Sequence, residues 1–289
     1  MAIKDLLIKK RVSRSIGGDV VLIVYLLFMA SVMMLPMVYA VSQSLKPNNE
    51  LWIFPPRFFV NNPTLNNYKD LFNLMSSSWA PFSRYLFNTV FITFAGTAGH
   101  ILIASLCAYP VAMYRFPGSN GFFVLVRTSL MFSGVVTAIP AFIIISKLKL
   151  LDSYGAVILP ALAMSLGFFL MKQFMEQTVH PAVLESAEMD GASELAKFFK
   201  IVMPMVKPAW LTLMIFTVQS LWNMGNTPYI YSEQLKTLPY AMGQIAAAGI
   251  ARAGVAAAIS VFMMIVPLTI FIVSQSNIIE TMSASGMKD

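Results

Sequence analysis

Charged residues are scarce in this sequence. Only 11% of its 289 residues are Asp, Glu, Lys or Arg, whereas 57% are hydrophobic and the mean hydropathy is +0.71. A soluble domain of this length usually carries about 25% charged residues, because they cover its surface. Long apolar stretches must therefore face something other than water, which excludes an ordinary soluble domain and indicates an integral membrane protein.

Cysteine and catalytic motifs are also nearly or wholly missing. Cys107 is the single cysteine and lies inside an apolar run, so there is no disulfide framework and the redox compartment is not constrained. The sequence contains no metal-ligand cluster, no nucleophile triad and no GxxxxGKS/T loop of the kind that cradles nucleotide phosphates. We predict a chain that is not an enzyme, that hydrolyses no ATP itself and that has no cofactor or metal of its own.

The net charge of +7 begins with a basic cluster at the N-terminus. Its members directly precede the first apolar run, where a cytoplasmic segment of residues 1–19 would carry them: Lys4, Lys9, Lys10, Arg11 and Arg14. The apolar stretch 20–41 is long enough to span, and no small-residue cleavage pattern follows it cleanly, which favours an anchor over a signal peptide. The sequence thus indicates a membrane protein and no nucleic-acid partner.

Six stretches can cross a bilayer as helices, at 20–44, 86–113, 121–146, 155–176, 209–228 and 255–275. They predict an all-α domain of six transmembrane helices over residues 20–275, with a tail of residues 276–289. An even number of spans places both termini on one side of the membrane. Lys and Arg number 12 on the predicted cytoplasmic side and 8 outside, a modest bias that the N-terminal cluster turns to N-in, C-in.

The polar segment between the fourth and fifth spans, residues 178–207, differs chemically from the rest of the chain. Pro181 suits the first turn of a short helix, and Gly191 can take the left-handed conformation that ends one. Ser193 can cap a following helix, which reaches Pro204. We expect a short helix outside the membrane, held between two turns and tied to two spans, which a partner could grip and use as a lever.

The same segment resembles the EAA loop of ABC importer permeases, which reads EAA, three residues, G, nine residues, I, two residues, P. Ser186 replaces the middle alanine, and an aspartate before the glycine is typical of the sugar branch. The positions that carry the resemblance are Glu185, Ser186, Ala187, Asp190, Gly191, Ile201 and Pro204. The resemblance implies a coupling helix that docks on an ATPase subunit, where hydrolysis moves the permease between inward- and outward-facing states.

Two further segments extend the resemblance to carbohydrate permeases of the maltose and oligosaccharide type. The first is the outer loop with Phe54-Pro55-Pro56 and residues 64–68, and the second is the tail 281–288, which resembles that of the smaller maltose-type subunit. The resemblance implies that the tail reaches between two ATPase subunits and that the loop 229–254 probes the sugar site of a binding protein. It also implies a location in the bacterial cell (inner) membrane, as a multi-pass protein. The other partners that it implies are a second homologous permease, ATPase subunits that bind ATP and Mg²⁺, an extracytoplasmic solute-binding protein, a saccharide and membrane lipid.

Polar residues inside spans are costly and tend to face the interior or a wet path. Candidates for a sugar path recur at spacings of three and four in the fifth span, on one expected helical face: Gln219, Trp222, Asn223 and Asn226. A second polar stripe marks the second span: Asn88, Thr89, Thr93, Thr97 and His100. The alternative for both sets is that these side chains bond helices to one another.

Other functions remain open at this point. An importer permease for phosphate, amino acids or polyamines would share the EAA loop, and only the outer loop and tail favour sugar. A secondary transporter would need intramembrane carboxylates, but none of the 13 acidic residues lies well inside a predicted span. Basic residues outnumber acidic ones on the predicted outer segments, which suits an acidic saccharide such as a uronate oligomer, or equally an acidic binding protein. The basic ones are Lys46, Arg57, Lys69, Arg84, Lys147, Lys149, Lys236 and Arg252, against Glu50, Asp70, Asp152 and Glu233.

Overall fold

The computed structural model describes residues 16–76, 80–247, 249 and 252–285. These residues form helices and connecting turns without a β-strand. The first part of the chain holds α2 (Ile16–Ser44), α3 (Asn48–Leu51), α4 (Asn66–Ser76), α5 (Phe82–Met113), α6 (Ser119–Ser129), α7 (Gly134–Lys147), α8 (Gly155–Leu162) and α9 (Ser165–Thr178). The second part holds α10 (Pro181–Met189), α11 (Glu194–Ala196), a π-helix (Lys197–Val202), α12 (Met203–Met205), α13 (Lys207–Trp222), a 3₁₀ turn (Glu233–Leu235), α14 (Leu238–Ala246) and α15 (Ala253–Ser285).

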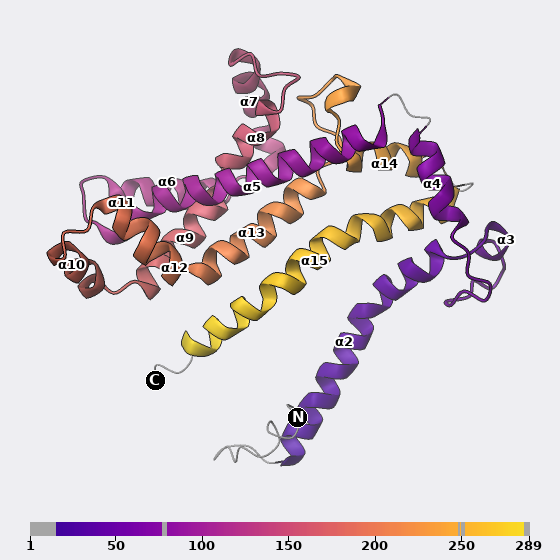
Figure 1. Ribbon diagram of the computed structural model, residues 1–289, viewed down its shortest axis with the longest axis horizontal. Helices are drawn as coiled ribbons and strands as arrows, with labels where there is room; N and C mark the ends of the chain where they lie inside the picture. The colour runs from indigo at the N-terminus through magenta and orange to yellow at the C-terminus, as the bar shows by residue number, and fades with distance from the viewer. Residues whose placement is uncertain (1–15, 77–79, 248, 250–251, 286–289) are drawn as a thin grey trace.

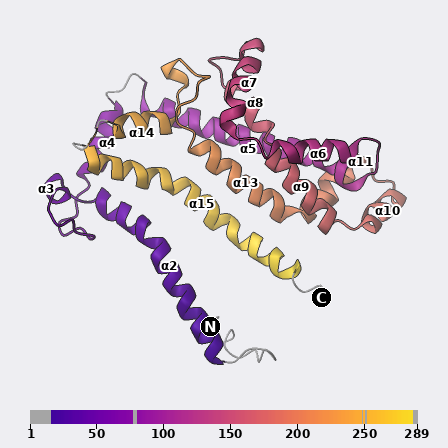
Figure 2. The same cartoon turned by 180° about the vertical axis from the view of Figure 1, so that it is seen from behind.

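The long helices α5, α9, α13 and α15 form the body of the molecule (Figures 1 and 2). The short helix α10 lies at one end of this body, and α3, α4 and α14 lie at the other end (Figure 1). Helix α2 packs against α15 but leaves the body along most of its length, so its apolar side chains are exposed. In a membrane protein such a surface faces lipid or another subunit rather than water.

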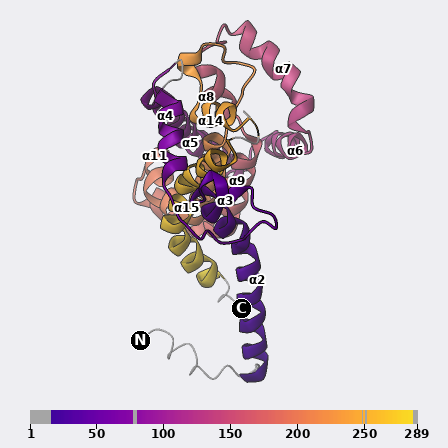
Figure 3. The ribbon, with the colours of Figure 1, turned by 90° about the vertical axis from the view of Figure 1, so that its right-hand side faces the viewer.

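Four helices are long and apolar enough to cross a membrane: Gly17–Ser44, Phe82–Met113, Gly155–Thr178 and Ala253–Gln275. Two bent pairs raise the number to six if each pair counts as one span. The first pair is α6 and α7, which meet at 111° on the outside of the body (Figure 3). The second is the segment Glu194–Met205 with α13, bent by 78°. The prediction of an all-helical membrane protein is confirmed, with four to six spans.

Two predicted spans are wrong in detail. The stretch 121–146 is not one helix, because the chain turns after Leu130 and Ser133 caps a new helix, accepting a bond from the Val135 amide (3.4 Å). The stretch 209–228 is helical only to Trp222, because Gly225 and Pro228 in the following run favour turns. At the other end of the chain, α15 continues to Ser285, beyond the predicted end of the last span. Residues 1–15 and 286–289, within the predicted N-terminal segment and tail, lie outside the described residues.

The buried core has two main parts. One joins α5, α9 and α13 to the segment after α10, with Met171, Met175, Phe198, Val202 and Leu213 among its most buried side chains. The other joins α4, the start of α5, α14 and the start of α15. Because the first core includes residues of α5, α9 and α13 and of the segment after α10, movement of that segment would displace the helices to which it is packed.

Candidate functional site

Helix α10 forms as its sequence predicts. Pro181 occupies the first turn, where its missing amide costs nothing. Leu184 and Ala187 are buried against the body, whereas Glu185 and Ser186 point outward. The helix therefore presents its motif carboxylate to the surroundings while an apolar strip fixes it to the rest of the chain.

Gly191 ends this helix with a positive φ of +73°. The Gly191 amide donates to the Glu188 carbonyl oxygen (2.9 Å) and the Ala192 amide to that of Ala187 (2.9 Å), which is the hydrogen-bond pattern of a Schellman motif. Two residues later the Ser193 hydroxyl accepts from the Ala196 amide (3.3 Å) and caps the next helix. The predicted roles of Gly191 and Ser193 in shaping the backbone are confirmed.

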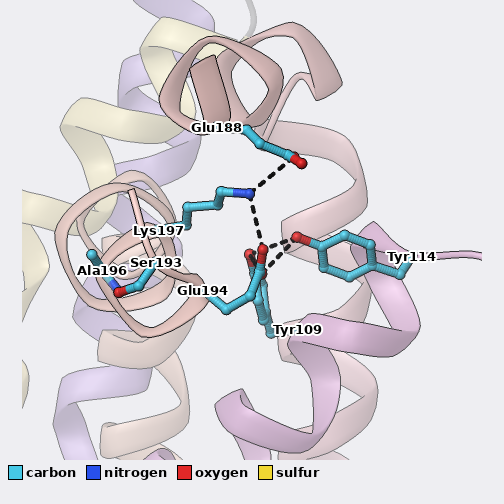
Figure 4. Close-up of polar contacts among 7 residues, drawn as sticks. All are labelled: Tyr109, Tyr114, Glu188, Ser193, Glu194, Ala196 and Lys197. Carbon is cyan, nitrogen blue, oxygen red and sulfur yellow. Dashed lines mark hydrogen bonds and ion pairs between the residues drawn. The ribbon is translucent and has the colours of Figure 1, made fainter. Parts of the chain in front are cut away.

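A buried lysine joins α10 to the helix that follows it. Lys197 is 2% exposed, and its Nζ lies 3.1 Å from Glu188 Oε2 and 2.9 Å from Glu194 Oε1 (Figure 4). The Glu194 carboxylate beside it, and secondarily Glu188, raise the pKa of Lys197. The lysine thus remains charged at neutral pH and ties the two helices across the Gly191 turn.

Glu194 extends this connection to the end of α5. Its Oε2 accepts hydrogen bonds from the hydroxyls of Tyr109 (3.1 Å) and Tyr114 (2.7 Å), which lie at the end of α5 and directly after it (Figure 4). The Tyr114 hydroxyl first, and then Lys197, lower the pKa of Glu194. One carboxylate therefore connects a spanning helix to the segment that carries the EAA-like motif.

The chain returns from this segment to α13 through a π-helix and a sharp bend. The π-helix buries Phe198 and Val202, and the bend of 78° follows at Met205 and Val206. Single π-turns are rare and are often found at functional sites. Ile201 is half-buried and Pro204 exposed, so these two motif residues lie on the returning helix rather than on α10.

The residues predicted for a sugar path do not share one face. Asn226 lies beyond the end of α13, so its prediction as part of a helical stripe is wrong. Gln219 and Asn223 are exposed neighbours, because Asn223 Nδ2 donates to the Gln219 carbonyl oxygen (2.9 Å). Trp222 instead is buried and donates from Nε1 to the Met263 carbonyl oxygen of α15 (3.0 Å).

The polar residues of α5 also fall into two groups, those that bond other segments of the protein and those whose hydroxyls have no partner among the described residues. Asn88 donates to the Gln234 and Lys236 carbonyl oxygens (2.8 Å each), and Thr89 accepts from the Leu238 amide (2.7 Å), so both hold the segment before α14. His100 lies 3.3 Å from the Leu162 carbonyl oxygen at the break between α8 and α9. These three contacts support the alternative that such side chains bond segments of the protein together.

Thr93 and Thr97 differ from their neighbours, because their hydroxyls have no partner among the described residues. They line an apolar groove of about 470 Å³ between α5, α13 and α15, and Trp222 also lines it. Within the described part of the chain no cluster of His, Cys, Asp or Glu is placed to hold a metal ion.

Three features of the site went unpredicted. The ion pair between Glu194 and Lys197 could be inferred from their spacing of three residues, but nothing in the sequence indicated that the lysine would be buried. The tyrosines that hold Glu194 are 80 or more positions away in the chain and gave no local signal. Met189, at the tip of α10, is 89% exposed, which is unusual for a large apolar side chain and visible only in the structure.

Comparison with known proteins agrees with this arrangement. Residues 100–283 match the family described as "Binding-protein-dependent transport system inner membrane component". Protein LplC of Bacillus subtilis (strain 168) is 34% identical over 211 residues, which are 71% of this chain and 67% of LplC. The polygalacturonan/rhamnogalacturonan transport system permease protein YtcP of the same strain is 32% identical over 74% of this chain and 72% of YtcP. The sn-glycerol-3-phosphate transport system permease protein UgpE of Yersinia enterocolitica (serotype O:8 / biotype 1B, strain NCTC 13174 / 8081) is 31% identical over 72% and 70%.

A solved structure has the same fold. A chain of a bacterial ABC transporter involved in the import of the acidic polysaccharide alginate superposes with a TM-score of 0.76, at 21% identity, over 91% of this chain and 98% of that chain. The present chain belongs to the family of binding-protein-dependent transport system inner membrane components. It is a multi-pass ABC importer permease of the bacterial inner membrane, with carbohydrate permeases among its relatives, as the sequence predicted.

Proposed function

We propose that this chain is one of two membrane-spanning subunits of a binding-protein-dependent importer, and that partner ATPase subunits drive it through α10. The observation that carries the proposal is the ion-paired connection from α10 through Lys197 and Glu194 to the end of α5. A docked element can transmit force only if it is tied to the helices that must move. The assembly would contain a second permease, two ATPase subunits that bind ATP and Mg²⁺, and an extracytoplasmic binding protein.

The exposed side of the coupling segment supports docking of a protein partner. Met189 stands at its tip, and Leu195 and Phe199 are exposed on the helix that follows. Glu185 and Asp190 are exposed on α10 and at its end. A mixed apolar and acidic surface of this kind fits a groove with apolar walls and a basic rim, because protein interfaces combine a buried apolar centre with charged edges.

The membrane orientation follows from the same proposal. With α10 on the cytoplasmic side, the end of α15 lies toward that side and α3, α4 and α14 lie toward the outside (Figure 1). Transport would be alternating access, in which ATP hydrolysis moves α5 and α13 through α10. The segment 229–237 would face the binding protein, and Asp152 holds it in place by accepting bonds from the Tyr231 (2.9 Å) and Ser232 (2.8 Å) amides.

For the substrate we propose an oligosaccharide, and among oligosaccharides an acidic one. Two proteins with acidic polysaccharides in their descriptions support this proposal: the polygalacturonan/rhamnogalacturonan permease among the relatives and the alginate importer among solved structures. The predicted excess of basic residues on the outer segments agrees with it. From this chain we expect Gln219 and Asn223, which are exposed side by side at the end of α13, to contribute to the path.

A second candidate is a small anionic solute that is not a saccharide. It is favoured by the permeases for sn-glycerol 3-phosphate, which match this chain as well as the saccharide permeases do. Both candidates share a negative charge, so they must be separated by experiment.

The test is ATPase activity of the purified assembly in lipid, stimulated by its binding protein loaded with each member of a substrate panel. The panel contains neutral maltooligosaccharides, galacturonate and alginate oligomers, and sn-glycerol 3-phosphate. We expect stimulation by the uronate oligomers. Stimulation by glycerol phosphate alone would replace the saccharide with the second candidate, and stimulation by neutral sugars alone would remove the acidic part of the proposal.

The coupling role has its own test in the same assay. Glu185→Lys reverses an exposed charge on α10, and Gly191→Pro removes the amide that ends the helix. Both variants should insert into the membrane and lose stimulated ATPase activity and uptake. Normal uptake by both variants would refute coupling through α10.

A further inference from the structure

A pocket of about 300 Å³ lies at the end of α2, where the chain enters α3 and passes the start of α15. Tyr39 and Gln43 of α2 form one wall, and Ala253 and Ala257 of α15 form another. The residues of the connecting segment that complete it are Lys46, Glu50, Leu51, Trp52, Pro56 and Arg57. The pocket is separate from the groove beside Trp222 and at the opposite end of the body from α10 (Figure 1).

The pocket contains an excess of positive charge. Lys46 is 1% exposed; its Nζ donates to the Arg57 carbonyl oxygen (2.5 Å), lies 6.0 Å from the centroid of the Tyr39 ring and forms no ion pair with a carboxylate of the described residues. An ammonium has three donors, and burial of a charge with so few partners is costly. Arg57 adds an exposed guanidinium at the rim. The single carboxylate, Glu50, is bound by the amides of Asn61 (2.7 Å) and Asn62 (3.3 Å).

Large apolar side chains surround this basic pocket. Phe54 is 92% exposed, Trp52 is 56% exposed, and Phe59 and Ile53 are also exposed on the same short segment. The neighbouring helix α2 exposes apolar side chains along its length. Aromatic residues are enriched at the level of lipid headgroups, because one end of that region is apolar and the other is wet. A soluble ligand would not need exposed apolar side chains around its pocket, whereas the acyl chains of a lipid would contact them.

We propose that this pocket binds the phosphodiester headgroup of an anionic membrane lipid, with Arg57 and Lys46 as the cationic groups and Trp52 at the boundary with the acyl chains. Arg57 contacts the phosphate at the rim of the pocket. Lys46 supplies a second, buried positive charge, and its hydrogen bond to the Arg57 carbonyl oxygen holds the Arg57 backbone in place. The headgroup would occupy the pocket between α2, α15 and the segment that contains α3. This site goes beyond the proposed transport function and depends only on the membrane location of the chain.

The experiment uses the complete chain, with its co-purifying subunits, in phosphatidylcholine vesicles that contain increasing fractions of a brominated lipid. Bromine quenches tryptophan fluorescence at short range, and the part of the quenching that is lost in Trp52→Phe reports the pocket. Brominated phosphatidylglycerol is compared with brominated phosphatidylcholine. The expected preference for the anionic lipid is about fivefold or more, because a basic residue near the membrane surface contributes about 1 kcal/mol to attraction of anionic lipid.

Three variants make the test specific. Arg57→Gln should lower the preference about fivefold, whereas Arg57→Lys should keep most of it, since the charge is retained. Lys69→Gln removes an exposed cation of α4 outside the pocket and should change nothing. Because Arg57 is exposed, the Gln variant should fold. Unchanged quenching of Trp52 by brominated phosphatidylcholine in this variant would show that the surroundings of Trp52 are intact.

Three results would overturn the proposal. Equal quenching by the two lipids would show that the pocket has no anionic preference. A full preference in Arg57→Gln would place the lipid elsewhere. Displacement of the brominated lipid by millimolar inorganic phosphate or a galacturonate trimer would assign the pocket to a soluble anion rather than to a lipid.

Discussion

The contact between Gly167 and His100 gives the sharpest prediction about packing. Gly167 is the third residue of α9 and faces α5. A Cβ atom added there would lie 2.2 Å from His100 Nε2 and 3.1 Å from Leu213 Cδ2. The His100 ring is completely buried, and its Nδ1 lies 3.3 Å from the Leu162 carbonyl oxygen, so it has little room to withdraw. We therefore expect Gly167→Ala to force α5 and α9 apart or to break the His100 contact.

The expected magnitude comes from two opposing effects. Overpacking a buried site costs about 1–3 kcal/mol, and a separation of 2.2 Å places this case in the upper part of that range. Alanine is favoured over glycine in a helix by up to about 1 kcal/mol. The net loss for Gly167→Ala is then about 1–2 kcal/mol. Gly121 offers a matched control, because it is the third residue of α6 and nothing lies within 4 Å of its added Cβ.

The assay is unfolding of the purified protein in mixed micelles by increasing amounts of SDS, followed by circular dichroism. Gly121→Ala should be neutral or more stable than wild type, so the two alanine variants should differ by about 2–3 kcal/mol. In a His100→Ala background, where the ring is absent, Gly167→Ala should lose most of its penalty. The reasoning would be refuted if Gly167→Ala matched Gly121→Ala in the wild-type background. A penalty of the same size with and without the His100 ring would refute it equally.

Three more predictions concern the polar contacts. Tyr114→Phe removes a 2.7 Å hydrogen bond to Glu194 and should raise amide exchange in residues 181–197 by about fivefold, as expected for a loss of about 1 kcal/mol; unchanged exchange would contradict the connection. The pKa of Glu194 lies below its ordinary 4.5, so the stability lost in Glu194→Gln should be constant at neutral pH and vanish only as the pH falls below about 4.5; thermal unfolding of both proteins across pH measures this. Asp152→Asn weakens the contacts to the Tyr231 and Ser232 amides and should lower binding-protein-stimulated ATPase activity without changing the basal rate, and equal loss of both rates would exclude a role limited to that segment.

The sequence predicted the membrane class and most of the helices because both depend on long apolar runs, which are local. It failed at the bend between α6 and α7 and at the end of α13. The run from residue 121 to 146 is mostly apolar, with Arg127 as its one charged residue, and hydropathy alone cannot show that Ser133 starts a new helix at 111° to the first. Similarly, polar spacing suggested one face through Asn226, although Gly225 and Pro228 carried the signal that the helix ends earlier.

In the segment 178–207, some contacts could be predicted from the sequence and others could not. Pro181, Gly191 and Ser193 act on the backbone within a few residues of themselves, so their roles could be read from residue type and spacing. The contacts of Glu194 with Tyr109 and Tyr114 depend on how α5 packs beside the segment. No local pattern contains that information, because it arises from the tertiary fold.

The two glutamates of α10 illustrate how the motif separates folding from recognition. Glu188 is bound to Lys197 and so helps to hold the turn at Gly191. Glu185 is exposed, and no described residue forms a hydrogen bond or ion pair with its side chain. An exposed carboxylate without an internal partner contributes little to the stability of the chain itself. The first residue of the motif is therefore free to interact with another subunit, while the glutamate three positions later keeps the helix that presents it in place.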